Sequence, residues 1–221
     1  MNHLLNEEQF PAGFLPAWFE ARRRHALEQA EQLPEPSRHM ESWRFGAPGN
    51  ESLEHVEAAP PAAPETLAPI IRERASMPEA LRIVYANGLP VSIPEELPEG
   101  LSVMDMEDFV LQCPDTARKY LETETETLGS EKLSALTTAL QHNGLVIMAD
   151  REISLPLEIL HFISGDNVAV FPSTLLIAET GSRLHILERH LSADHGRQFC
   201  GALQQYHLSS ASSVKYALVQ E

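Results

Sequence analysis

The chain has 221 residues, 43% of them hydrophobic, and can bury one large core or two small ones. Its 32 acidic and 16 basic side chains give a formal charge of −16. A surface of that sign repels phosphate, which argues against nucleic acid and anionic membrane surfaces as partners.

The cysteine content and the first residues indicate the compartment. Cys113 and Cys200 lie far apart and form no CxxC pair, so the sequence predicts no disulfide framework and a reducing environment. The N-terminal stretch MNHLLNEEQF lacks the basic start and the apolar run of a signal peptide. No window approaches the ~18 apolar residues of a membrane span. We therefore expect a cytoplasmic protein with no membrane or nucleic-acid partner.

The N-terminal third is predicted to be mainly helical. Residues 14–33 carry apolar side chains at helical spacing and end before Pro34, which predicts an amphipathic helix. In PSRHMESWRF, Trp43 and Arg44 form either a docking motif or a core tryptophan beside a surface arginine. Residues 46–66 are rich in Pro, Ala, Gly and Glu, which predicts a linker.

Two elements in the middle of the chain have clear local signals. Residues 81–93, LRIVYANGLPVSI, are a hairpin candidate because the Asn-Gly dipeptide adopts the positive φ angles of a tight turn. Residues 130–144 predict a helix, with Ser130 as its N-terminal cap and Asn143-Gly144 as a left-handed stop.

From Gly144 onward the sequence has strand composition. Short apolar segments are separated by Gly, Asp, Asn or Ser, which is typical of a sandwich, a barrel or a β-solenoid. Periodicity alone leaves the three open. The last segment, SSVKYALVQE, alternates like a strand and places Val214, Tyr216 and Leu218 on one face.

One stretch of this half concentrates side chains that bind metals. Its members are His185, Glu188, His190, His195, Cys200 and His207. On a strand Glu188 and His190 share a face and His185 takes the other, so Glu188, His190 and Cys200 are the candidate ligands for iron or zinc. The intervals do not match a closed zinc site, and solvated or core histidines are the simpler alternative. Cys200 is either a reactive thiol or a small buried apolar residue.

Catalytic motifs are absent from the sequence. It contains no phosphate loop, no GxGxxG after a strand, no HExxH and no GxSxG. Their absence weakly favours a protein that is not an enzyme.

Several segments together resemble the SufB/SufD family of iron–sulfur cluster assembly proteins, and its SufD members most. PSRHMESWRF is similar to the family's Pro-Thr-Arg-x-x-Glu-x-Trp-Arg-Tyr segment. LRIVYANGLPVSI and LPEGLSV are similar to its strand, Asn-Gly turn, strand and Leu-Pro-x-Gly-Val run. LTTALQHNGLVIMAD, LPLEILHFIS and FPSTLLIAETGSRLHILERH follow in the family's order, with Ser173 where the family usually has arginine.

The resemblance implies an α+β fold. We expect a mainly helical region with a small hairpin over residues 1–143, followed over 144–221 by the first coils of a right-handed parallel β-helix, or β-solenoid. The implied function is that of a non-catalytic scaffold component of iron–sulfur cluster assembly, acting with a SufB-like protein and a SufC-like ATPase. It implies no intrinsic cofactor, with an iron–sulfur cluster held only in the complex. The alternative is a metal- or ligand-binding solenoid or jelly-roll domain, including an enzyme.

The end of the chain bears on the predicted partners. Family members are about twice as long, and the segments that contact SufC would lie beyond Glu221, so no catalytic or SufC-binding residue is carried over. The last coil of a solenoid exposes unpaired backbone groups, which another chain segment normally covers. We therefore expect either a longer natural chain, which we favour, or a homodimer or partner contact through Val214, Tyr216 and Leu218. Trp43 and Arg44 are the other predicted contact residues.

Overall fold

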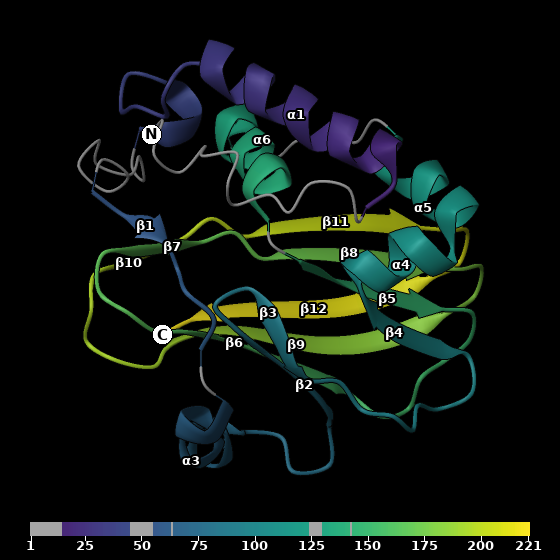
Figure 1. The fold of residues 1–221 in the computed structure, drawn as a ribbon. Helices are drawn as coiled ribbons and strands as arrows, with labels where there is room; N and C mark the ends of the chain where they lie inside the picture. Colours follow the sequence, from purple (N-terminus) through teal and green to yellow (C-terminus); the bar gives the residue numbers. More distant parts are fainter. Residues whose placement is uncertain (1–14, 45–54, 63, 124–129, 142) are drawn as a thin grey trace.

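The computed structural model describes residues 15–44, 55–62, 64–123, 130–141 and 143–221 (Figure 1). Three β-sheets form the body of the fold, and helices lie over the outside of the sheets (Figure 1). The predicted linker over 46–66 lies partly outside the described residues. Among the described residues, no helix combines the length and the apolar character needed to cross a membrane.

The helices lie on two sides of the sheets. Near the N-terminus are α1 (Ala17–Gln32) and the short 3-10 helix η3 (Glu41–Trp43). The others are α3 (Pro64–Arg74), α4 (Met106–Gln112), α5 (Pro114–Leu121) and α6 (Glu131–Leu140). Helices α1 and α6 pack together on one side, α4 and α5 lie beside them, and α3 lies on the opposite side (Figure 1).

Twelve strands are present in the described residues. Those before residue 144 are β1 (Glu57–Ala58), β2 (Leu81–Ala86), β3 (Leu89–Ser92) and β4 (Leu101–Asp105). Those after it are β5 (Gly144–Ala149), β6 (Leu157–Ile163), β7 (Val168–Val170), β8 (Ser173–Ala178), β9 (Arg183–Ser192), β10 (Gln198–Cys200), β11 (Leu203–Leu208) and β12 (Ser213–Gln220).

The sheets take every third strand of the C-terminal half. Their orders are β1-β7-β10, β11-β8-β5-β4 and β12-β9-β6-β2-β3. The pairs β5–β8, β8–β11, β6–β9, β9–β12 and β7–β10 are all parallel. Strands β10, β11 and β12 are therefore edge strands, one in each sheet.

The predicted fold class, an α+β protein ending in a right-handed parallel β-helix, is wrong. The structure is an α/β fold with mixed sheets, in which β2–β3 and β4–β5 are antiparallel pairs. Strands from before residue 144 also share all three sheets with strands from after it. The physical reason is that β5, β6 and β7 need backbone partners on their second side, and β4, β2 and β1 supply them. The division of the chain into units at residue 143 stays a prediction.

The predicted hairpin over 81–93 is confirmed. Strands β2 and β3 are antiparallel and are joined by Asn87 and Gly88, whose φ angles are 48° and 80°. Both angles are positive, as a two-residue hairpin turn of type I′ requires. The Asn87 side chain also holds neighbouring backbone, because its Nδ2 donates to the Pro60 carbonyl (2.7 Å) and its Oδ1 accepts from the Ser164 N–H (2.9 Å).

The helix predicted over 130–144 is shorter than expected. Ser130 caps α6 as predicted, accepting a hydrogen bond from the Leu133 N–H (3.2 Å), but the helix ends at Leu140. The residue that follows the helix, Gln141, has a φ of −57°, so the left-handed stop predicted at Asn143-Gly144 is wrong. The Asn143 side chain instead accepts hydrogen bonds from the Met106 N–H (3.0 Å) and the Gly144 N–H (2.8 Å), which joins the start of α4 to the start of β5.

The largest core lies between the two larger sheets. Its buried members include Ile83, Leu145, Ile159, Leu176 and Leu184, one from each of five strands. Outside the sheets, α4 and α5 pack on β5 and β8, and α3 packs on β2, β6 and β9. This arrangement leaves β5, β6 and β8 covered on both faces, which explains why their sequences are largely apolar.

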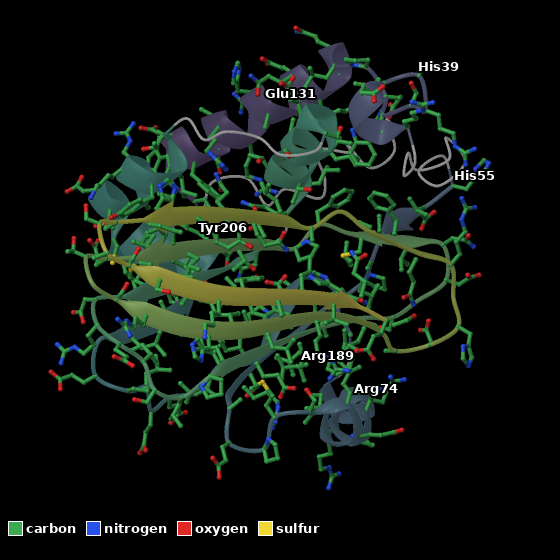
Figure 2. The ribbon with its side chains drawn as sticks, turned by 180° about the vertical axis from the view of Figure 1, so that it is seen from behind. His39, His55, Arg74, Glu131, Arg189 and Tyr206 are labelled. Carbon is green, nitrogen blue, oxygen red and sulfur yellow. The ribbon has the colours of Figure 1, made fainter. Side chains whose placement is uncertain are left out.

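Helix α3 is tied to β9 by charged groups. Arg189 of β9 lies next to Arg74 at the end of α3 (Figure 2) and donates to its carbonyl oxygen. Both arginines also pair with Glu221, Arg189 at 2.6 Å and Arg74 at 3.4 Å.

Candidate functional site

On β9, a group of polar side chains follows the core residues on the same face of the strand. Leu184 and Ile186 of that strand point into the main core, and alternation puts Glu188 and His190 on the same face. On the neighbouring strand β6, His161 stands opposite His190 in the parallel register. One ligand atom of each of His161, Glu188 and His190 lies within 4.8 Å of the others, and all three residues are buried.

Glu188 is the centre of this group and its carboxylate is fully buried. Its Oε1 lies 2.7 Å from His190 Nε2 and accepts from Gln204 Nε2 (3.0 Å). Its Oε2 accepts from the hydroxyls of Thr174 (3.3 Å) and Tyr216. Burial by itself raises the pKa of Glu188, but the hydrogen bond to His190 and the positive charge near it outweigh burial and lower the pKa to about 2.

His190 lies between Glu188 and Cys200. Its Nδ1 is 3.3 Å from the Cys200 sulfur, and its ring stacks on that of His161, with centroids 4.7 Å apart and planes at 13°. Burial lowers the pKa of His190, but hydrogen bonds to Cys200 and Glu188 outweigh burial and raise the pKa to about 9. The ring is therefore protonated near pH 7 and donates from both nitrogens.

His161 has a different environment although it touches the same carboxylate. It is 4% exposed, and neither ring nitrogen has a hydrogen-bond partner among the described residues. Its Nε2 is 3.6 Å from Glu188 Oε1, which is too long for a hydrogen bond. Burial and the neighbouring His190 lower the pKa of His161 to about 4, against an opposing effect of Glu188, so the ring is neutral near pH 7.

A hollow of about 460 Å³ leads to this group from the surface. Its lining includes His190 and Cys200, together with Ser192, Gln198 and Gln220. The hollow therefore lies among β9, β10 and β12 and gives a small solute access to the side of the His190 ring that faces Cys200.

The structure brings together the three predicted ligands Glu188, His190 and Cys200. His185 lies on the opposite face of β9 and is exposed, and His195 is exposed in the segment between β9 and β10. His207 packs against Tyr120, with ring centroids 4.9 Å apart. Metal binding by the predicted residues stays a prediction.

His161 is the residue that sequence reasoning missed. It comes from a different strand, and only the register of β6 against β9 puts it opposite His190. The available signal was a histidine within the largely apolar segment LPLEILHFIS.

The predicted contact residues lie in two places. Trp43 is half-buried in η3, and its indole nitrogen has no hydrogen-bond partner among the described residues, while Arg44 is exposed. Val214 and Tyr216 pack partly against the main core from the edge strand β12, and Leu218 is 46% exposed.

Apolar side chains collect along the edges of β11 and β12. Tyr206 of β11 is labelled in Figure 2, and its ring packs edge-on against that of Tyr216, with ring centroids 5.3 Å apart. Tyr206, Leu208, Leu218 and Val219 are all exposed. We call Tyr206, Leu208, Tyr216 and Leu218 the edge patch; Val219 lies on the opposite face of β12.

Fold and site together define an α/β protein with mixed sheets, in which a buried polar group lies close to the edge strands β10, β11 and β12. No protein-family model matches the chain. The chain is 25% identical over 187 residues to iron–sulfur cluster assembly protein SufD of Bacillus subtilis, a match that covers 80% of this chain and 42% of that protein.

The chain also matches mycobacterial proteins. It is 31% identical over 97 residues to an iron–sulfur cluster assembly SufBD family protein of Mycobacterium bovis and equally to one of Mycobacterium tuberculosis. These matches cover 43% of this chain and 11% of the relatives. The relationship to SufB/SufD proteins inferred from sequence segments is thus confirmed, and the chain spans less than half the length of the curated relatives it matches.

Proposed function

We propose that this protein is a non-catalytic scaffold component of cytoplasmic iron–sulfur cluster assembly, of the SufD kind. The supporting observation is the similarity to SufD, which extends over 80% of the chain. In this proposal the partners are a SufB-like protein and a SufC-like ATPase. The iron–sulfur cluster is cargo that is held in the complex, and the protein has no intrinsic cofactor.

The edge strands provide a physical basis for protein contact. Ser213 N–H donates to the Ser182 carbonyl and Glu221 N–H donates to the His190 carbonyl, both at 2.9 Å, so the odd-numbered residues of β12 bond to β9. Bonding direction alternates along a strand, so Val214, Tyr216 and Leu218 turn their N–H and C=O groups away from β9. A row of such groups next to the edge patch suits the addition of a strand from another chain segment.

A capture experiment tests the proposed role. Tagged protein is co-expressed with the SufB-like and SufC-like proteins of its source organism and purified under reducing, anaerobic conditions. We expect the SufB-like protein to be retained in stoichiometric amount, and the SufC-like protein with it. Retention of neither partner contradicts the proposal.

The edge patch predicts self-association in the absence of partners. We expect light scattering to give a concentration-dependent dimer, because a second copy can cover the apolar side chains of β11 and β12. Leu218→Lys puts a charge into the edge patch and is expected to give a monomer. Ala217→Lys is the matched control, because it adds the same charge next to Leu218 on the opposite face of the strand, and the dimer should persist. A wild-type monomer at all concentrations, or equal loss of the dimer in both variants, would refute this contact.

The second candidate function is that of a metal-binding domain. It is favoured by one observation, the buried group of two histidines and a carboxylate. Metal binding and scaffolding are compatible, because the three polar side chains are buried, whereas Tyr206, Leu208 and Leu218 of the edge patch are exposed.

A further inference from the structure

We propose that His161, Glu188 and His190 bind one divalent first-row transition metal ion, iron(II) or zinc(II). The inference does not depend on the proposed assembly role, because it rests on the geometry of three side chains and their neighbours.

The donor set suits such an ion. Two imidazoles and one carboxylate are the protein ligands of many iron(II) and zinc sites, and they leave positions for water or a substrate. Bonds of ~2.0–2.2 Å place ligand atoms roughly 3–3.5 Å apart. His161 Nε2 is 3.6 Å from Glu188 Oε1 and His190 Nε2 is 2.7 Å from it, so an ion fits after small side-chain movements.

Neighbouring groups already hold the proposed ligands in place. The Cys200 sulfur lies 3.3 Å from His190 Nδ1 and can accept a hydrogen bond from it, so a bound ion displaces only the proton on Nε2. The hydroxyls of Thr174 and Tyr216 and the amide of Gln204 fix the Glu188 carboxylate. Cys200 is therefore a positioning residue in this proposal and does not itself bind the ion.

The unpaired state of His161 points to a missing ligand. Buried polar side chains almost always have a hydrogen-bond partner, yet among the described residues neither nitrogen of this 4% exposed ring has one. The ring stacks on His190 and its Nε2 lies near the Glu188 carboxylate, where the ion would sit. A bound ion satisfies the Nε2 atom without moving the backbone.

The hollow lined by His190 and Cys200 brings solvent to the Nδ1 side of the His190 ring, and neither His161 nor Glu188 lines it. The proposed ion therefore lies on the buried side of that ring, away from the hollow.

Metal titration of the purified protein tests the proposal. Cobalt(II) serves as the spectroscopic probe, zinc(II) as competitor, and iron(II) is titrated anaerobically. We expect one equivalent of cobalt to bind with high affinity and to give absorption bands that disappear when zinc displaces the cobalt. His161→Gln and His190→Gln are expected to weaken binding by ~100-fold or more, since removal of even an outer partner of a ligand typically costs 10–100-fold.

His185→Gln is the matched control, because it makes the same substitution on the exposed face of β9 and should leave affinity unchanged. Circular dichroism checks that each variant folds. An anomalous difference map from crystals soaked in zinc does not depend on any variant. A peak among His161, Glu188 and His190 supports the site. No peak there, no binding at micromolar metal, or equal loss in His185→Gln overturns it.

Discussion

Glu188→Ala is expected to lower the free energy of unfolding by roughly 3–5 kcal/mol, the usual cost of removing one partner of a buried ion pair. The substitution leaves a protonated His190 without its anion and removes the acceptor for Thr174, Tyr216 and Gln204. Urea unfolding followed by circular dichroism measures the loss.

Two variants bracket this result. Glu188→Gln keeps the shape and one acceptor oxygen, so we expect a smaller loss than for alanine. Glu152→Ala removes an exposed carboxylate and should change the stability by less than about 0.5 kcal/mol. A Glu188→Ala protein as stable as Glu152→Ala would show that the buried group does not hold β9, β11 and β12 together.

Stability without bound metal is expected to be greatest near pH 6.5 and to fall on both sides. The pKa of His190 is raised to about 9, so its contribution is complete below its ordinary value of 6.5 and is lost as the pH rises through 9. The pKa of His161 is lowered to about 4, so on acidification the unfolded chain binds a proton at this histidine at a higher pH than the folded chain does. Stability therefore falls as the pH decreases from 6.5 through 4. The lowered pKa of Glu188 adds a further loss below 4.5, down to about 2.

The alkaline side gives the clearest measurement. Urea unfolding at pH 6.5 and pH 9 should differ by on the order of 3 kcal/mol in the wild type. His190→Gln should abolish most of that difference, whereas His185→Gln should retain it. Equal stability of the wild type at both pH values, or the same fall in His190→Gln, would contradict the assignment of a protonated His190.

Local features of the sequence were enough to predict several elements of the structure. The hairpin at Asn87-Gly88 and the cap at Ser130 depend on residues adjacent in the chain, and both were predicted from those residues. The common face of Glu188 and His190 follows from alternation along one strand, and the structure puts them 2.7 Å apart.

Long-range pairing explains what the sequence did not reveal. Strand β2 pairs with β6 and β4 pairs with β5, and no local pattern specifies either partner, so the fold class was wrong. His161 joins the site only through the register of β6 against β9. The assumption that Asn143-Gly144 ends the helix also failed, because the Asn143 side chain bonds instead to the start of α4.

Cluster formation tests the proposed scaffold role most directly. The SufB-like and SufC-like proteins are incubated anaerobically with iron, sulfide and ATP, with and without this protein, and the iron and sulfide bound to protein are measured. We predict that the amount of bound cluster increases with added protein up to one equivalent per SufB-like protein, with no cluster on this protein alone. Equal amounts of cluster with and without this protein would contradict the proposed scaffold role.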